Sequence, residues 1–332
     1  MHGIGLQILG SGEYVPRSRV ESTELDRRWG KDPGWTARQT GVTTRAYAAD
    51  DESVVVMGAA ASRQALDAAA LDPAELDAII AVGSVPYQAI PCTAVFIQRE
   101  LGLGDSGIAA FDVNSSCLGF LVALDLVSSA IATGRYRRVL IVASERASQG
   151  LNANDSSTAG LFGDGAGAII VGVPTRTGPR LRAAYMQTFG DGVEYCQLRA
   201  GGTGLPPRTL MDEFLSGTYF EMQGRQTYRM AAAVLPGFLQ SLWERAASSV
   251  EDIDVWVPHQ ASGRAITHLQ SALNLPTDRF VLTLPTHGNQ VAASLPIALH
   301  RGIAEQRINP GQRVVLIGSG AGISLGGAVL DI

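Results

Sequence analysis

The chain has 332 residues, of which 46% are apolar and only 17% are charged, and its formal net charge is −5. This length exceeds that of a usual single domain, so we expect two domains or two related halves, and the apolar content argues against disorder. The positive charges are scattered, which argues against a nucleic-acid partner, and no apolar run reaches the roughly 18 residues of a membrane span.

The cysteines and the start of the chain indicate the compartment. Cys92, Cys117 and Cys196 form neither a metal-binding spacing nor a disulfide framework, which points to a reducing environment. The N-terminus has no basic start followed by an apolar core, so nothing in it resembles a secretory signal. We therefore expect a cytoplasmic protein.

Helical and strand patterns alternate along the first part of the chain. Apolar residues recur at helical spacing over 53–70 and 118–133. Short apolar runs bounded by turn residues lie at 76–82, 138–142 and 167–171, as is typical of strands buried on both faces. This alternation predicts an α/β fold.

The second part of the chain repeats this pattern. The apolar runs at 253–257, 313–317 and 327–330 resemble the three earlier runs in the same order, and helical spacing recurs over 231–247 and 296–306. Any α/β protein offers some similar strands, but three matches in order favour a duplication. We therefore predict two related α/β halves.

Two segments rich in turn residues indicate connections. The segment 174–179 contains two prolines and a glycine and is interpreted as the connector, which predicts halves at 1–173 and 174–332. The segment 201–219 is polar and rich in glycine and proline between two apolar stretches. We expect it to be a mobile loop at a substrate entrance.

Cys117 is a candidate nucleophile because small polar residues precede it and a long apolar helical pattern follows it. At a helix N-terminus, free N–H groups and the helix dipole favour an anion, so we expect a lowered thiol pKa and a site for an oxyanion. The alternative is a small buried apolar residue, and this segment alone does not decide between them. Cys92 and Cys196 have no comparable setting and are interpreted as structural.

His259 and Asn289 become informative only together with Cys117. His259 follows the strand predicted at 253–257, where sites of α/β folds lie, and Asn289 lies in a turn before a helical pattern. Taken singly, each is more typical of a structural histidine or a helix cap. A decarboxylative Claisen condensation, however, needs a nucleophile that holds an acyl group and neutral donors that stabilise an enolate.

Five motifs in this order resemble the β-ketoacyl-acyl-carrier-protein synthase III family of condensing enzymes, essentially end to end. They surround Cys117 and lie at 162–168, 257–261, 287–294 and 318–326. The resemblance implies a thiolase-like fold, in which two pseudo-duplicated α/β halves form a layered α-β-α-β-α architecture. It also implies a homodimer.

The resemblance assigns roles to single residues of this chain. Cys117 corresponds to the acylated nucleophile, and His259 and Asn289 to the pair that promotes decarboxylation. The backbone N–H groups of Cys117 and Ala321 would form the oxyanion hole, although the family usually has glycine where this chain has Ala321. Arg264 matches a position that docks the acidic carrier protein.

Departures from the family concern the coenzyme A site. Trp35 matches a tryptophan that grips the coenzyme A nucleotide, but the two partner arginine positions hold Gln39 and Ser156, with Arg38 one place before Gln39. Losing these contacts is expected to weaken coenzyme A binding or alter its pose. The donor is then a carrier-protein thioester or a coenzyme A ester held differently.

Two further positions concern the acyl group. In the family, the loop at 85–91 reaches into the partner subunit's acyl pocket, and Ile90 stands where phenylalanine is frequent, so the pocket could open to a longer or branched primer. Drift of the loop without consequence is the alternative. Arg146 could bind the second carboxylate of a diacid primer if it faced the pocket, but a surface position or pairing with Glu145 is the preferred interpretation.

The predicted function is that of a condensing acyltransferase acting on a non-acetyl primer. An acyl group loaded on Cys117 is joined to a malonyl thioester to give a 3-oxoacyl thioester. The expected partners are acyl-coenzyme A or acyl-carrier protein and malonyl-carrier protein, with no cofactor, metal, nucleic acid or membrane. Acyl transfer without condensation, onto an alcohol or amine, is the alternative, and a subunit without chemistry is disfavoured because all three groups are present.

Overall fold

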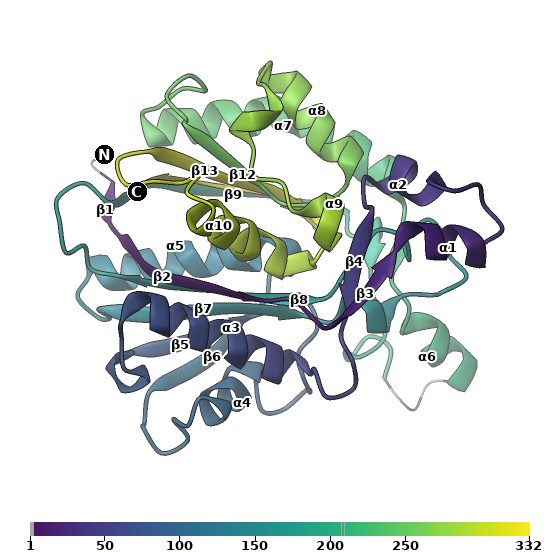
Figure 1. Ribbon diagram of the computed structural model, residues 1–332, viewed down its shortest axis with the longest axis horizontal. Helices are drawn as coiled ribbons and strands as arrows, with labels where there is room; N and C mark the ends of the chain where they lie inside the picture. Colours follow the sequence, from purple (N-terminus) through teal and green to yellow (C-terminus); the bar gives the residue numbers. More distant parts are fainter. Residues whose placement is uncertain (1–2, 207, 209) are drawn as a thin grey trace.

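The computed structural model describes residues 3–206, 208 and 210–332. Two mixed five-stranded sheets lie one above the other, with helices between them and on both outer faces (Figure 1). The layers therefore follow the order α-β-α-β-α, as the resemblance implied.

The first sheet has the strand order β2-β8-β7-β5-β6. In it β5 runs parallel to β6 and β7, whereas β8 is antiparallel to β7 and β2. Its strands are β2 (Gln7–Tyr14), β5 (Ala78–Val82), β6 (Ala109–Val113), β7 (Arg138–Glu145) and β8 (Gly165–Gly172).

The second sheet has the strand order β1-β9-β14-β13-β12. In it β12 runs parallel to β13, whereas β14 is antiparallel to β13 and β9. Its strands are β1 (Ile4–Gly5), β9 (Arg180–Gly192), β12 (Val255–Pro258), β13 (Arg313–Gly320) and β14 (Gly322–Asp331).

The two sheets confirm the duplication that the sequence predicted. The three predicted pairs of strands, β5 with β12, β7 with β13 and β8 with β14, have the same neighbours and the same directions in the two sheets. The short strand β1 belongs to the second sheet although it precedes β2 in the chain. The boundary between residues 173 and 174 stays a prediction.

Helices make three layers, one on each outer face and one between the sheets (Figure 1). The outer face of the first sheet is covered by α3 and α4, the outer face of the second by α7 and α8, and the space between the sheets is filled by α5 and α10. These helices are α3 (Val54–Ala69), α4 (Thr93–Glu100), α5 (Gly119–Ala132), α7 (Gly224–Ala246), α8 (Gly263–Leu273) and α10 (Ser294–Ala304).

The remaining elements flank the end of the sandwich where the site lies. They are β3 (Ser18–Glu21), β4 (Thr44–Tyr47), β10 (Cys196–Gln197), β11 (Glu221–Met222), α1 (Ser22–Arg28), α2 (Trp35–Thr40), α6 (Met211–Gly217) and α9 (Leu284–His287). The segment 201–219 is thus not a loop throughout, because α6 lies within it. Asp212 and Glu213 in the first turn of α6 complement the helix dipole, while positions 207 and 209 lie outside the described residues.

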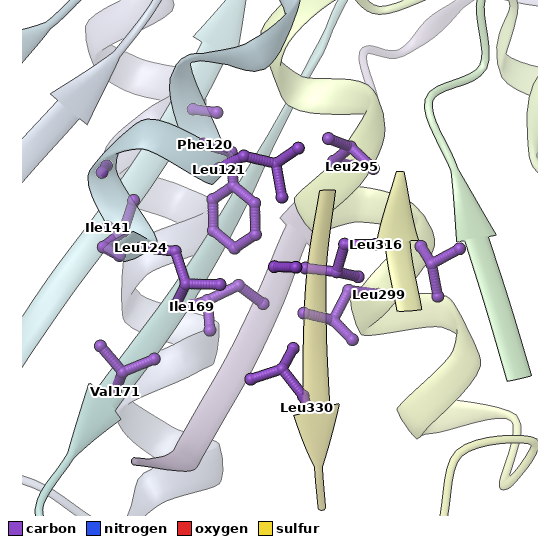
Figure 2. Packing of buried hydrophobic residues seen from close by; sticks show 14 of the residues in the cluster. Phe120, Leu121, Leu124, Ile141, Ile169, Val171, Leu295, Leu299, Leu316 and Leu330 are labelled. Atoms are coloured by element: carbon purple, nitrogen blue, oxygen red, sulfur yellow. The ribbon is translucent and has the colours of Figure 1, made fainter. Parts of the chain in front are cut away.

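The strands are apolar on both faces because helices cover both faces. In β7, Val139 and Ile141 pack toward the middle layer, whereas Leu140 and Val142 pack toward α3. The middle helix α5 is accordingly apolar nearly all round. Figure 2 shows the side chains of this shared core, among them Phe120, Leu121, Leu124, Ile141, Ile169, Leu295, Leu299, Leu316 and Leu330.

Replacing Phe120, which is fully buried in this middle layer, by alanine should lower the free energy of unfolding by about 3–5 kcal/mol, because a large cavity would remain between the sheets. Urea unfolding at fixed protein concentration measures the change. The matched control is Val56→Ala on α3, where the side chain is 37% exposed and the change should stay within about 0.5 kcal/mol. Equal losses in the two variants would contradict the assignment of the core.

Candidate active site

Cys117 lies in a single 3-10 turn, Ser116–Leu118, between β6 and α5. The residue before it, Ser116, has a φ of +48°, and its N–H donates to the Asn114 Oδ1 at 2.9 Å, which holds the turn in this strained conformation. Gly119 begins α5 so close to Val82 of β5 that any Cβ would overlap that side chain. The sequence around the cysteine thus fixes it at the start of α5, as predicted.

His259 follows directly on β12, and its N–H donates to the Ile317 carbonyl of β13 at 2.7 Å. A Cβ at Gly318 would lie 2.6 Å from the His259 Cβ and 3.2 Å from the Leu118 Cδ2. Gly318 therefore separates the histidine from the residue that follows Cys117. The absence of a side chain there lets the two segments approach each other.

Asn289 is fixed by both its backbone and its side chain. Its N–H donates to the Leu161 carbonyl at 2.9 Å, and its carbonyl accepts from the Gly163 N–H at 3.1 Å. Its Nδ2 donates to the Ala261 carbonyl at 3.2 Å, and its Oδ1 accepts from the Val291 N–H at 2.9 Å. The amide orientation is thereby set, and one Nδ2 hydrogen stays available to a ligand.

The structure brings the three predicted residues to one place. The turn Ser116–Leu118 packs against β13 and against the turn Val291–Ala293 that follows Asn289, and Asn289 in turn bonds to the segment that carries His259. Each residue comes from a different part of the chain. Only the tertiary fold makes them neighbours.

His259 is neutral at physiological pH. It is 5% exposed, and burial lowers the pKa of its imidazole to about 4. Its Nδ1 is buried and has no hydrogen-bond partner among the described residues. A neutral imidazole can accept a proton or donate one hydrogen bond without adding charge to the site.

The expectation of a lowered thiol pKa is wrong. Protein atoms crowd the sulfur, and burial together with the nearby Glu145 carboxylate raises the pKa of Cys117 to about 12. The resting nucleophile is therefore the thiol, and its attack needs a base that removes the proton. The start of α5 still offers N–H groups to an oxyanion.

Sequence reasoning missed two neighbours of Cys117. Glu145, at the end of β7, and Cys196, in β10, both lie close to Cys117, and a negative charge on either would disfavour a Cys117 thiolate. Burial raises the pKa of Cys196 itself, so its thiol stays protonated at neutral pH. The Cys196 Sγ lies 3.4 Å from the Thr227 Oγ1. A carboxylate ending an apolar strand was a visible signal for Glu145, whereas nothing local marked Cys196.

Ala321 lies in the turn between β13 and β14, beside the turn of the nucleophile. A Cβ at the preceding Gly320 would lie 3.2 Å from the Leu118 Cγ and 3.7 Å from the Leu118 nitrogen. The residue before the predicted second oxyanion donor thus contacts the residue after Cys117. The role of Ala321, like those of the other predicted site residues, stays a prediction.

The residues predicted to bind coenzyme A lie on α2 and the loop before β8. Trp35 packs edge-to-face against Trp29 with ring centroids 6.5 Å apart, and the Lys31 Nζ lies 5.2 Å from the centroid of the Trp35 ring. The Trp29 indole donates to the Ala153 carbonyl at 2.8 Å, which ties this pair to the loop that carries Ser156.

Arg38 and Gln39 have different partners. The Arg38 Nη1 donates to the Pro33 carbonyl at 3.3 Å, so Arg38 braces its own loop. The Gln39 Oε1 accepts from the Arg264 Nη2 at 3.0 Å, which joins α2 to α8. Gln39 therefore holds the predicted carrier-docking arginine, a contact between residues 225 positions apart that the sequence did not reveal.

Ile90 and Arg146 lie in different surroundings. Ile90 is 84% exposed in the segment between β5 and α4. The Arg146 Nη2 donates to the Ala48 carbonyl at 3.2 Å. Burial raises the pKa of Asp164, and the Arg146 charge opposes part of this rise. Within the described ranges no ion pair joins Arg146 to Glu145, the pairing that had been considered.

Comparison with family models and known proteins gives consistent matches. Residues 111–190 match the family described as 3-oxoacyl-[acyl-carrier-protein (ACP)] synthase III, and residues 243–332 match its C-terminal part. An acetoacetyl-CoA synthase of Streptomyces sp. (strain CL190) is 36% identical over 334 residues, covering 100% of both chains. A β-ketoacyl-[acyl-carrier-protein] synthase III of Sphingopyxis alaskensis is 37% identical over 326 residues, covering 97% of this chain and 98% of its own.

A solved structure agrees with these sequence matches. The priming β-ketosynthase of the R1128 polyketide biosynthetic pathway has a TM-score of 0.88 at 31% identity. The match covers 99% of this chain and 97% of that one.

The His259 imidazole should stay neutral down to about pH 5, because burial holds its pKa at about 4. Proton–carbon NMR of protein labelled at the histidine Cε1 positions measures this, and His259→Gln assigns the signal. The His259 resonance should not move between pH 8 and pH 5. A midpoint between pH 6 and 7 would contradict the buried neutral imidazole.

Proposed function

The chain belongs to the 3-oxoacyl-[acyl-carrier-protein] synthase III family, and we propose that Cys117, His259 and Asn289 carry out a decarboxylative condensation in it. An acyl group is loaded on Cys117 and then joined to a malonyl thioester, which releases carbon dioxide and gives a 3-oxoacyl thioester. The observation that carries this proposal is the convergence of the three side chains on the seam between the two halves.

The first step acylates Cys117. Its sulfur attacks the carbonyl carbon of an acyl thioester, and the neutral imidazole of His259 takes the thiol proton, since the pKa of Cys117 is too high for a standing thiolate. The backbone N–H groups of Cys117 and Ala321 stabilise the tetrahedral oxyanion. Collapse breaks the bond to the departing thiol, which leaves with the proton from His259.

The second step generates the carbon nucleophile. As the carboxylate of the malonyl thioester leaves as carbon dioxide, the electron pair of the breaking bond forms an enolate. His259 and the free Nδ2 hydrogen of Asn289 donate to the enolate oxygen. Both donors are neutral, so they stabilise the developing charge without holding the starting carboxylate too tightly.

The third step joins the two fragments. The enolate carbon attacks the thioester carbonyl on Cys117, with the oxyanion again held by the backbone N–H groups. Collapse expels the Cys117 thiolate and releases the 3-oxoacyl thioester. The thiolate takes a proton from solvent water, which balances the proton that the condensation consumes and returns the site to its neutral resting state.

Acyl transfer without condensation is not favoured. Such a transfer needs no enolate, so it gives no reason for an amide and an imidazole that are both fixed beside the acylated sulfur. The relatives named above are synthases and a priming ketosynthase, whose names describe condensation. The presence of all three groups equally disfavours a subunit without chemistry.

The donor is a carrier-protein thioester or a coenzyme A ester that is held differently from the way the family usually holds it. Trp35 is present, but Gln39 is engaged by Arg264 and Ser156 brings no charge to a phosphate. A relative named as an acetoacetyl-CoA synthase keeps coenzyme A esters among the donors, beside carrier-protein thioesters. The non-acetyl primer, the docking role of Arg264 and the absence of a cofactor remain parts of this proposal.

A homodimer is part of the proposal as well. Val85, Tyr87, Ile90 and Phe111 are exposed apolar residues in one region, the segment between β5 and α4 and the neighbouring edge strand β6. An exposed edge strand with apolar neighbours favours pairing with another chain. A second copy of this chain covering that face would also bring Ile90 to the partner's site, as the resemblance implies.

In the described part of the chain no helix is long and apolar enough to cross a membrane. The cytoplasmic location stays a prediction.

Alanine variants of the three residues should affect different steps of the reaction. Cys117→Ala should abolish acyl loading and lower 3-oxoacyl product by at least about 10³-fold. Asn289→Ala should keep loading and lower carbon dioxide release by about 10²–10³-fold, whereas His259→Ala should lower both loading and carbon dioxide release, because His259 acts in both steps. Intact-mass measurement with a panel of coenzyme A and carrier-protein thioesters, followed by malonyl-carrier protein, measures both steps. Near wild-type product from Cys117→Ala would end the proposal.

Charge on the exposed apolar face should disrupt the dimer. Phe111→Glu should shift the wild-type mass, measured by size-exclusion chromatography with light scattering, from two chains toward one, because burying an unpaired carboxylate at an interface is unfavourable. Leu210→Glu, at a 79% exposed position on another surface, is the matched control and should leave the mass unchanged. A monomeric wild-type protein would refute the dimer.

A further inference from the structure

Glu145 is a buried carboxylate that has no role in the three proposed reaction steps. It ends β7, is 3% exposed, and lies next to Cys117 at the seam between the two halves. Burying a carboxylate costs free energy unless the group is hydrogen-bonded or paired with an opposite charge. Both of its hydrogen bonds to backbone lead toward the site.

The first bond leads to the second half of the chain. The Glu145 Oε1 accepts from the Ala292 N–H at 3.4 Å. Ala292 lies in the turn Val291–Ala293, which is separated from Asn289 by Gln290 alone. Val291 in that turn has a φ of +51°, a strained value for a β-branched residue, so the turn needs outside contacts to keep its shape.

The second bond leads to the nucleophile. The same Oε1 accepts from the Ser84 N–H at 2.7 Å, and the Ser84 carbonyl accepts from the Asn114 Nδ2 at 3.2 Å. The Asn114 Oδ1 in turn accepts from the Ser116 N–H, which holds the strained residue before Cys117. One oxygen is thus linked to both strained turns, of which one contains Cys117 and the other begins two residues after Asn289.

We propose that Glu145 is a positioning residue for the condensation, whose single carboxylate oxygen holds the Asn289 turn and the Cys117 loop at a fixed separation. The inference rests on the proposed function. It concerns the step in which the acyl group on Cys117 and the enolate near Asn289 must meet. Acyl loading needs Cys117, His259 and the oxyanion donors but not Asn289, so the two steps depend differently on this separation.

The protonation of Glu145 is compatible with this role. Burial raises the pKa of Glu145 to about 7, against the lowering effect of the Ser84 and Ala292 N–H donors. The accepting oxygen is present whether the group is ionised or not. A glutamine at this position keeps that oxygen and its reach while it removes the charge.

Three variants of the protein distinguish the effect of side-chain length from the effect of charge. Glu145→Gln keeps the length of the side chain and removes its charge. Glu145→Asp keeps the charge and shortens the side chain, and Glu145→Ala removes both. Asp77→Ala is the matched control, because Asp77 accepts from the Arg137 and Arg138 N–H groups at the other end of β7, away from the site.

The readout is the rate of condensation of pre-acylated enzyme divided by the rate of acyl loading. Loading uses the acyl-coenzyme A of the panel that acylates wild type fastest, and condensation uses malonyl-carrier protein. Glu145→Asp and Glu145→Ala should lower this ratio by about tenfold or more, whereas Glu145→Gln should stay within about threefold of wild type. Asp77→Ala should leave the ratio unchanged even if it lowers the melting temperature.

The outcomes are distinguishable. A wild-type protein that neither loads Cys117 nor releases carbon dioxide would refute the proposed function. A wild-type protein that does both, with an unchanged ratio in Glu145→Asp, would overturn the role of Glu145 alone. A low ratio in Glu145→Gln with a normal one in Glu145→Asp would assign an electrostatic role instead, and if Glu145→Ala fails to fold, the aspartate and glutamine variants still decide.

Discussion

At the active site the two halves pack so closely that the residue between them cannot carry a side chain. Gly318 on β13 lies between His259 and Leu118, and a methyl group there would push apart the histidine and the loop of the nucleophile. Gly119 meets the same constraint on the other side of Cys117, where α5 starts against β5. The distance between catalytic groups is therefore set by the packing of backbones, which are the least adjustable parts of the molecule.

The site is also arranged to carry little charge at rest. The thiol is protonated, the imidazole is neutral and Asn289 is an amide, so charge develops only while the reaction proceeds. A buried charge without a partner would be costly, and a permanent cation would bind the malonyl carboxylate that has to leave. The pKa values of Cys117 and His259, moved in opposite directions by the same burial, follow from this dry environment.

The sequence was informative where the signal was local. The buried strands, the helices α3, α5, α7 and α10 and the position of Cys117 at the start of α5 all follow from short patterns of apolar and small residues. The thiol pKa was not predictable in this way, because it depends on the crowding of folded chain around the sulfur and on Glu145 from another strand. The contact between Gln39 and Arg264 and the approach of Cys196 likewise depend on tertiary packing between distant segments.

The place of β1 has a consequence for how the protein is made. Ile4 and Gly5 pair with Leu181 and Arg180 of β9, which belong to the second sheet. During synthesis, β1 is therefore translated long before β9 and stays unpaired while all strands of the first sheet are translated. In the N-terminal half alone, β1 would have no partner strand. Its pairing with β9 therefore forms only after the second half has been translated, and it then links the two halves.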